Sequence, residues 1–316
     1  MKILVTDTVT LMRNFDVSLD VLKKFGDVEI HEKLTREELF ECIKDADVLL
    51  CNEVIVNREV FEKAKKLKLI SVLATGYNTI DIEAAREFGV TVCNAGSYST
   101  DAVAQQVFGY ILNYYSQTAA YGAIVKDGAW ESGNRADVFT FPTDEIAGKT
   151  IGIVGYGNIG RRVADIALAF GMNVLACNRS KKIDERVTFV DFDELLQKSD
   201  IVSLHCPQHR ENKGMFNKET FEKMKDGAFF INTARGGLVV EEDLRDALNS
   251  GKLCFAATDV LRREPMRSDC PLKQAKNILI TPHTGWAPKS TRERLIKIMA
   301  DNIEAYLNGK PINVVS

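Results

Sequence analysis

The strongest constraint on the fold is the stretch from Thr150 to Gly160, which reads TIGIVGYGNIG. Its first half is a short β-branched apolar run, which is typical of a buried parallel strand. Gly155, Gly157 and Gly160 follow with the spacing G-x-G-x-x-G, and a helical apolar pattern begins behind them. In this order the first glycine allows a tight turn, the second admits a pyrophosphate, and the third lets helix and strand pack closely. The stretch therefore predicts a dinucleotide-binding turn with the helix N-terminus facing the phosphates.

Length and composition set the broad class. The chain has 316 residues, of which 45% are hydrophobic, so about two domains are expected. A net charge of −3 gives no general attraction to nucleic acid or to anionic membranes. The 7 cysteines form no C-x-x-C pair, which favours reduced thiols and gives no reason to expect a metal site. Without a signal peptide or a long apolar run, the protein is expected to be soluble and cytoplasmic, with no nucleic-acid or membrane partner.

Strands and helices alternate along both halves of the chain. Strands are expected at 3–6, 28–31, 48–51, 69–73 and 90–93, and helices at 18–25, 35–44, 57–65 and 81–88. Thr35 with Glu38 three residues later predicts a capping box at one of these helices. In the second half, strands are expected at 150–154, 173–177, 201–205, 228–233, 254–260 and 278–281, with helices at 192–198, 218–224 and 241–250.

This alternation predicts an α/β protein with two Rossmann-like, doubly wound parallel sheets. We expect residues 1–99 and 286–316 to form the substrate (catalytic) domain and residues 100–285 the dinucleotide-binding domain. The last helix, at 287–308, is expected to fold back on the first of these domains. Residues 101–120 are expected to form one long helix, and 122–142 an irregular arm that carries aromatic side chains. This arm could dock on a second subunit or lie against its own domain.

The end of the second strand after the glycine motif bears on the cofactor. An acid that would accept from the adenosine ribose is expected about 20 residues after the motif. The chain instead has Asn178, Arg179, Ser180 and Lys181, with no acid before Asp184. A guanidinium, a hydroxyl and ammonium groups suit a 2′-phosphate, so we predict NADP(H) as the preferred cofactor, with NAD(H) possible. A solvated basic loop is the alternative interpretation.

Three polar residues follow three of the expected strands: Arg235, Glu264 and His283. Each alone has an ordinary explanation as a surface or structural residue. Together, behind a dinucleotide motif, they are the set that hydride transfer to a 2-keto acid needs. An imidazole moves the hydroxyl proton, a carboxylate orients it and favours the imidazolium, and a guanidinium binds the substrate carboxylate.

With these motifs in view, the chain resembles the D-isomer-specific 2-hydroxyacid dehydrogenases over nearly its whole length. The motifs that carry the resemblance are Gly155–Gly160, Ala234–Gly237, Asp259–Val260, Glu264–Pro265 and Thr281–His283. The stretches 74–76, 204–207 and 286–288 look most like the glycerate dehydrogenase or hydroxypyruvate/glyoxylate reductase branch. The resemblance implies a flavodoxin-like substrate domain, a cleft between the domains, and a homodimer formed through the cofactor domains.

The resemblance also implies the role of each site residue. His283 would be the acid/base, Glu264 its partner and Arg235 the substrate anchor, while Asp259 would hold the nicotinamide carboxamide. The predicted substrate-binding residues are Thr75, Gly76, Tyr77 and Trp286. The predicted cofactor-binding residues are Gly155, Gly157, Asn158, Ile159, Gly160, Asn178, Arg179, Ser180, Lys181, His205, Cys206, Pro207, Thr233, Ala234, Arg235, Asp259 and His283.

The expected reaction is reduction of a small 2-keto acid, hydroxypyruvate or glyoxylate, to the D-2-hydroxy acid by NAD(P)H. A branched-chain or aromatic D-2-hydroxyacid dehydrogenase is the enzymatic alternative. Four aromatic residues could either shrink the pocket or contact an apolar side chain: Tyr77, Phe139, Phe141 and Trp286. A dinucleotide-sensing corepressor is the alternative that is not an enzyme. Thr284-Gly285 stands where this branch often has an apolar residue and alanine, a departure that could alter the cofactor contacts.

Overall fold

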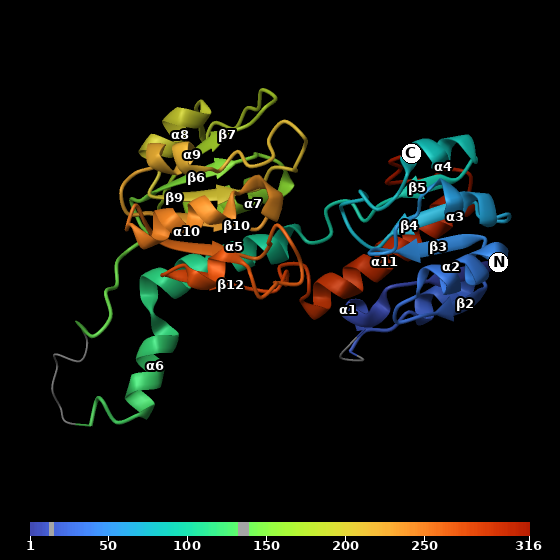
Figure 1. Cartoon of the computed structure of the whole chain (residues 1–316), viewed down its shortest axis with the longest axis horizontal. Coiled ribbons are helices and arrows are strands. Elements are labelled where there is room, and N and C mark those ends of the chain that lie inside the picture. The colour runs from blue at the N-terminus through green and yellow to red at the C-terminus, as the bar shows by residue number, and fades with distance from the viewer. Residues whose placement is uncertain (13–15, 132–138) are drawn as a thin grey trace. The chain divides into compact units, whose positions relative to one another are not determined.

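A computed structural model describes residues 1–12, 16–131 and 139–316 (Figure 1). The chain divides into two compact units, one of residues 1–99 with 286–316 and one of residues 100–285. Each unit is built on its own sheet, and every strand pair in both sheets is parallel. The predicted fold class, two doubly wound parallel α/β sheets, is confirmed.

The first unit has a five-stranded sheet in the order β2-β1-β3-β4-β5. Its strands are β1 (Lys2–Val5), β2 (Asp27–Ile30), β3 (Val48–Cys51), β4 (Leu69–Val72) and β5 (Thr91–Cys93). This is the flavodoxin-like order. All residues of β3 and β4 are buried, because helices cover both faces of the sheet.

One apolar cluster lies on each face of this first sheet. The helices of the unit are α1 (Thr8–Met12), η1 (Asp20–Phe25), α2 (Arg36–Cys42), η2 (Ile43–Asp45), α3 (Arg58–Lys63), α4 (Ile82–Glu87) and α11 (Lys289–Leu307). The capping box of Thr35 and Glu38 is confirmed at the start of α2. The helix expected at 18–25 is instead a 3₁₀ helix that begins at Asp20. The Ser18 hydroxyl accepts the backbone N–H of Asp20 and donates to the Asp20 carboxylate at the start of this helix.

The last long helix, α11, belongs to this first unit although it ends the chain. Its apolar residues Leu295, Met299 and Ile303 pack against Ile3 and Leu69 of the sheet. The guanidinium of Arg292 donates two hydrogen bonds of 2.7 Å to the carboxylate of Asp16. The helix therefore completes the core of a sheet that is formed by the first hundred residues.

The second unit has a seven-stranded sheet in the order β12-β11-β10-β9-β6-β7-β8. Its strands are β6 (Thr150–Val154), β7 (Asn173–Cys177), β8 (Thr188–Phe189), β9 (Ile201–Leu204), β10 (Ala228–Asn232), β11 (Leu253–Thr258) and β12 (Ile278–Ile280). The chain order reverses between β6 and β9, and crevices of this kind bind ligands in open α/β sheets. Its helices are α5 (Thr100–Ser116), α6 (Thr118–Lys126), α7 (Asn158–Ala169), α8 (Phe192–Lys198), α9 (Lys218–Lys223), η4 (Gly236–Leu238), α10 (Glu241–Asn249) and η5 (Pro271–Gln274).

The prediction of one helix over 101–120 is wrong. Gln117 has a left-handed backbone with φ 49°, which ends α5 at Ser116 and starts α6 in a new direction. The prediction that 122–142 is wholly irregular is also wrong, because α6 continues to Lys126. Residues 132–138 of this arm lie outside the described residues. No helix within the described residues is long and apolar enough to cross a membrane.

Candidate active site

The predicted catalytic residues stand on three loops that leave neighbouring strands. Strand β11 pairs with β10 on one side and with β12 on the other, all parallel. Arg235 follows β10, Glu264 follows β11, and His283 follows β12. Because the carboxyl ends of parallel strands meet at one edge of a sheet, the three loops share that edge, where ligands bind in folds of this kind.

His283 and Glu264 form a direct pair. Nδ1 of His283 lies 2.7 Å from Oε2 of Glu264, and both side chains are exposed. The other carboxylate oxygen, Oε1, accepts the backbone N–H of Leu261 at 2.9 Å, so the carboxylate cannot turn away from the ring. A carboxylate at Nδ1 fixes the proton there, which leaves Nε2 to exchange a proton with a substrate.

The charge of Glu264 follows from its contacts. Burial opposes ionisation of this carboxyl, but hydrogen bonds from His283 and from the Leu261 N–H outweigh it and lower the pKa of Glu264 below its usual value. The nearby guanidinium of Arg235 acts in the same direction. Glu264 is therefore a carboxylate at neutral pH and accepts the proton that Nδ1 of His283 donates.

The loop that carries His283 is held by Asp259, which is 3% exposed. Oδ1 of Asp259 accepts from the Thr281 hydroxyl and from the Thr284 N–H, and Oδ2 accepts from the Gly285 N–H at 2.8 Å. His283 itself has φ 54°, a left-handed conformation that costs a non-glycine residue roughly 1–3 kcal/mol. The three hydrogen bonds to one buried carboxylate hold this strained turn in place.

A tyrosine extends this network into the helix α5. The hydroxyl of Tyr110 forms a short hydrogen bond with the Thr281 hydroxyl. Because Thr281 gives its single proton to Asp259, Tyr110 must be the donor. Gly285 fits the same network, since a Cβ at this position would lie 3.0 Å from Oδ2 of Asp259. The glycine that departs from the family pattern thus lets its own N–H approach the carboxylate.

Arg235 lies on a turn that Asn232 shapes. The buried amide of Asn232 accepts the Ala234 N–H and donates to the Arg235 carbonyl, both at 3.0 Å. Gly236 allows the backbone of Leu261 to lie against it, since a Cβ there would stand 2.0 Å from the Leu261 carbonyl carbon. The exposed guanidinium of Arg235 donates one hydrogen bond, to the Ala234 carbonyl. The Arg235 turn and the Glu264 loop are therefore packed backbone to backbone.

His205, by contrast, is not suited to acid/base work. It follows β9, where its Nε2 lies 2.9 Å from the Ser203 hydroxyl. Burial lowers the pKa of His205 to about 3, so the ring is neutral at physiological pH. Of the two histidines predicted in the site, only His283 has a carboxylate partner within the described residues.

The three glycines of the turn after β6 differ in what surrounds them. A Cβ on Gly155, which has φ +100°, would stand 2.6 Å from the Cys206 nitrogen, and one on Gly160 would stand 2.2 Å from the Gly155 carbonyl oxygen. A Cβ on Gly157 would meet nothing within 4 Å. The outer two glycines thus allow the tight turn and the close packing of helix on strand. The middle one leaves open space at the N-terminus of α7, where a pyrophosphate would approach.

The loop after β7 is fastened to this turn by two side chains. The side-chain carbonyl of Asn178 accepts the Tyr156 N–H at 3.0 Å, and its amide nitrogen donates to Ser180. The Tyr156 hydroxyl donates to Oδ2 of Asp184 at 2.8 Å. Burial and this hydrogen bond raise the pKa of Tyr156 to about 12, so it remains a donor. Asn178, predicted to contact cofactor, thus also shapes the loop.

The charges of this loop are divided between paired and unpaired groups. Arg186 donates to the carboxylates of Asp184 and Asp165, both at 2.8 Å, so the first acid of the loop is already neutralised. Arg179, Lys181 and Lys182 are exposed, and within the described residues they form no ion pair. These three cations are available to an anionic ligand.

The residues present fit a bound dinucleotide. The hydroxyl of Thr233, next to Arg235, is buried and has no hydrogen-bond partner within the described residues. Oδ2 of Asp259 accepts one hydrogen bond and has capacity for a second. A nicotinamide carboxamide has the donors and the acceptor that these groups lack, so these groups would suit the nicotinamide end of a cofactor, and the open space at Gly157 would suit its central pyrophosphate.

The predicted substrate residues of the first unit lie after β4 and before α11. The Thr75 hydroxyl donates to the Gly96 carbonyl at 2.6 Å, and Asn94 donates to the Thr75 carbonyl, so the loop from Thr75 to Tyr77 is anchored to its neighbour. Tyr77 is exposed. Trp286 packs against the apolar cluster beneath α11. Their contact with substrate stays a prediction.

The sequence did not indicate the residues whose hydrogen bonds position the loops of the site. Tyr110 and Thr281 position the His283 loop, and Tyr156 with Asp184 positions the loop after β7. Tyr156 sits inside the glycine motif, but its residue type carries no functional signal there. Tyr110 lies on α5, 171 residues from Thr281, and no local pattern connects the two.

A dinucleotide-type turn and an Arg–Glu–His edge on one parallel sheet define a pyridine-nucleotide-dependent oxidoreductase. The family model described as "D-isomer specific 2-hydroxyacid dehydrogenase, NAD binding domain" matches residues 108–285. The chain is 41% identical to a hydroxypyruvate reductase of Blautia hydrogenotrophica, with 100% of both chains covered. It is 36% identical to a glycerate dehydrogenase of Methylorubrum extorquens, with 91% of each chain covered.

A solved structure agrees with these relatives. An acyclic imino acid reductase in complex with NADPH and D-Arg superposes with a TM-score of 0.83 at 30% identity, over 100% of both chains. The chain therefore belongs to the D-isomer-specific 2-hydroxyacid dehydrogenase family, and the resemblance found from its motifs is confirmed.

Proposed function

We propose that this enzyme reduces a small 2-keto acid, hydroxypyruvate or glyoxylate, to the D-2-hydroxy acid, with NADPH as the preferred hydride donor. The observation that carries the proposal is the His283–Glu264 pair at the carboxyl edge of the second sheet. An exposed imidazole with one nitrogen fixed by a carboxylate is a proton donor for a carbonyl oxygen that becomes a hydroxyl. The relatives named hydroxypyruvate reductase and glycerate dehydrogenase support this substrate class.

Each residue then has a defined task. His283 gives the proton at Nε2 to the substrate oxygen, while Glu264 stabilises the imidazolium before transfer. Arg235 binds the substrate carboxylate with the guanidinium nitrogens that do not donate to the Ala234 carbonyl. Asp259 holds the His283 turn and offers its remaining acceptor position to the carboxamide. The bound nicotinamide supplies the hydride.

The proposed preference for NADPH rests on the loop after β7. Arg179 and Lys181 are exposed and form no ion pair within the described residues, and Asp184 is paired with Arg186, so a 2′-phosphate would meet cations that have no other partner there. NAD(H) remains the second cofactor, because Asn178 can also accept from a ribose hydroxyl. The structural neighbours include one complex with NADPH and one with NAD, so the proposed preference rests on the loop itself.

The test is a panel of initial rates for hydroxypyruvate, glyoxylate, pyruvate and 2-ketoisocaproate, each with NADPH and with NADH. We expect the highest kcat/KM for the two smallest oxygenated acids, with NADPH. Turnover of the branched acid alone would replace the substrate and keep the mechanism. A preference for NADH would overturn the phosphate argument, and absence of turnover with every acid would favour a binding protein.

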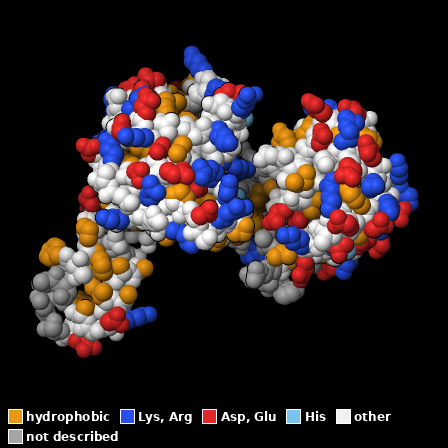
Figure 2. Space-filling view, in the orientation of Figure 1, with side chains coloured by type: hydrophobic (Ala, Val, Ile, Leu, Met, Phe, Trp, Pro, Cys, Tyr) orange, Lys and Arg blue, Asp and Glu red, His pale blue; other side chains and the backbone are white. Residues whose placement is uncertain are grey.

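We further propose that the enzyme is a homodimer that buries α6. This helix has no buried residue, and the residues that follow it include Trp130 with 62% of its surface exposed. Figure 1 shows α6 outside the layers of its own unit, and Figure 2 shows apolar side chains gathered over it. Light scattering should give twice the chain mass for the wild type and the monomer mass for Val125→Asp with Trp130→Ser. A monomeric wild type would contradict the proposal.

A cytoplasmic location is proposed from the thiols. All 7 cysteines are free in the structure, although several are partly exposed. Proteins of oxidising compartments usually pair such residues, so free thiols are typical of a reducing compartment. Fractionation of expressing cells followed by an activity assay would test this, and activity in an extracellular fraction would contradict it.

A further inference from the structure

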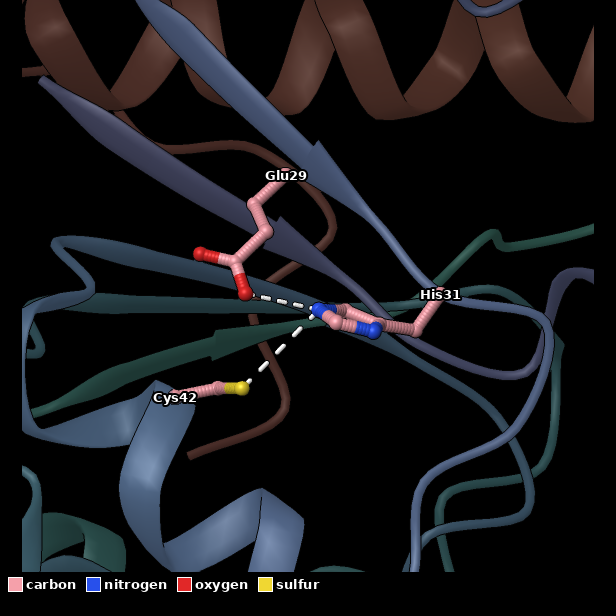
Figure 3. A group of neighbouring side chains, drawn as sticks. All are labelled: Glu29, His31 and Cys42. Atoms are coloured by element: carbon pink, nitrogen blue, oxygen red, sulfur yellow. Dashed lines mark hydrogen bonds and ion pairs between the residues drawn. The ribbon is translucent and has the colours of Figure 1, made fainter.

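A second cluster of chemically active side chains lies in the first unit. Glu29 is in β2, His31 directly follows that strand, and Cys42 is the last residue of α2. Glu29 and His31 are two residues apart, so they leave the same face of the strand. Figure 3 shows the three side chains pointing toward one another. None of them belongs to the catalytic set of the second unit.

The ligand atoms of these residues are close enough to share one ion. Nε2 of His31 lies 2.6 Å from Oε1 of Glu29 and 3.8 Å from Sγ of Cys42, and all three atoms lie within 4.8 Å of one another. Atoms bound to one tetrahedral Zn²⁺ at about 2.0–2.3 Å stand about 3.3–3.8 Å apart. The Cys–His separation already meets this geometry, and the Glu–His separation widens when a metal replaces the bridging proton.

The surroundings support the carboxylate as a ligand. Oε2 of Glu29 accepts from the ammonium of Lys2 at 2.8 Å, which directs the other oxygen to His31. Partners of this kind orient metal ligands from outside the coordination sphere.

A surface pocket leaves room for the fourth ligand. Its walls include His31 and Cys42 together with Leu34, Phe40 and three glutamates, Glu37, Glu38 and Glu41. Glu41 is paired with Lys44, and Glu38 holds the start of α2, so neither competes for the ion. Water from the pocket can reach the open side of the trio, as in sites with three protein ligands.

We propose that Glu29, His31 and Cys42 bind one thiophilic divalent cation of the Zn²⁺ type, with water as the fourth ligand. The separations of 2 and 11 residues match no common zinc motif, so the sequence alone does not point to this site. The ion ties β2, an edge strand, to the end of α2. Binding to the folded chain alone therefore raises the melting temperature of the protein.

The experiment uses the full chain and Co²⁺ as a spectroscopic probe. We expect one Co²⁺ per chain, a near-ultraviolet thiolate-to-cobalt band, and loss of that band when Zn²⁺ is added. Cys42→Ser should abolish the band, and His31→Gln should weaken binding by at least about tenfold, the lower limit seen for changes outside the coordination sphere. Cys270→Ser is the matched control, because this half-buried thiol also lies near a carboxylate, 4.0 Å from Glu241.

A second measurement requires no variant. Zn²⁺ should protect Cys42 from alkylation in the wild-type protein, as mapped by mass spectrometry, while Cys270 reacts at an unchanged rate. An equal cobalt band in Cys42→Ser and wild type would overturn the proposal. So would a wild type that shows neither the band nor protection, in which case the trio is a hydrogen-bonded cluster only.

Discussion

His283 combines an exposed imidazole with a left-handed backbone, and at the scale of single residues we expect turnover to depend on it most. General acid catalysis typically contributes about 10²–10⁴-fold, so His283→Ala should lower kcat for keto acid reduction by at least that range. His209→Ala is the control, since this exposed histidine makes its described hydrogen bond through the backbone. A His283→Ala enzyme with most of its activity would contradict the assigned role.

Glu264 should set the pH range of reduction. Its lowered pKa keeps it ionised at and above neutral pH, and its negative charge then favours the protonated form of its imidazole partner. A neutral amide cannot do this, so in Glu264→Gln the fall of kcat/KM on the alkaline side should move to lower pH. The measurement is a pH profile of reduction for both proteins, and superimposable profiles would rule out the pairing as a functional one.

The difference between active-site and supporting residues explains what sequence could predict at this scale. The position of Arg235, Glu264 and His283 at one edge of the sheet was predictable because each follows a strand, whereas their roles in catalysis stay predictions. The second task of Asp259, holding the His283 turn, depends on hydrogen bonds to Thr284 and Gly285 that exist only once β11 and β12 pair. Such contacts leave no periodic or local mark in the sequence.

At the scale of elements, the turn from β6 into α7 contains two glycines whose replacement by alanine should have different effects. Gly160→Ala would place a Cβ 2.2 Å from a backbone oxygen, and overpacking of this kind costs about 1–3 kcal/mol. Gly157→Ala meets open space, so it should leave the melting temperature nearly unchanged and raise the KM for NADPH by blocking the pyrophosphate. Thermal melts and cofactor titrations of both variants test this. If Gly157→Ala lowered the melting temperature and Gly160→Ala raised the KM for NADPH, the open space at Gly157 would not be the phosphate site.

The loop after β7 gives a prediction about cofactor choice. Replacing Arg179 and Lys181 with alanine removes two exposed cations and leaves the Tyr156–Asp184 hydrogen bond in place. The KM for NADPH should rise at least tenfold while the KM for NADH changes little. Lys198→Ala, a surface cation of α8 that pairs with Glu194, is the control. Equal effects on both cofactors would mean that the loop does not read the 2′-phosphate.

Most elements were predictable, and the exceptions share a physical cause. The strands 48–51, 150–154 and 173–177 and the helix 192–198 have the expected bounds, because apolar runs and caps are local signals. The break between α5 and α6 was missed because Gln117 is not a residue that marks a left-handed position. The two-residue strand β8 was also missed, since its pairing with β7 alone defines it.

At the scale of the whole molecule, the two units differ in how the chain builds them. Residues 100–285 are continuous and contain two apolar clusters of their own. Expressed alone, this segment should be monodisperse and melt cooperatively. Residues 1–99 alone should not melt cooperatively, because one face of their sheet lacks α11. Residues 1–99 joined by a short linker to residues 286–316 should fold. Circular dichroism melts compare the three, and a cooperative transition for 1–99 alone would contradict the expectation.

The split first unit also has a consequence for the living cell. The ribosome releases β1 to β5 long before it has made α11, the helix that covers one face of their sheet. At about 5–20 residues per second, synthesis of the intervening residues 100–285 takes roughly 10–40 s. Throughout that interval the apolar face around Ile3 and Leu69 lacks α11, so the nascent chain offers chaperones a binding surface that the finished enzyme conceals. The second unit is translated later than β1 to β5, but it can complete its fold before the first unit does.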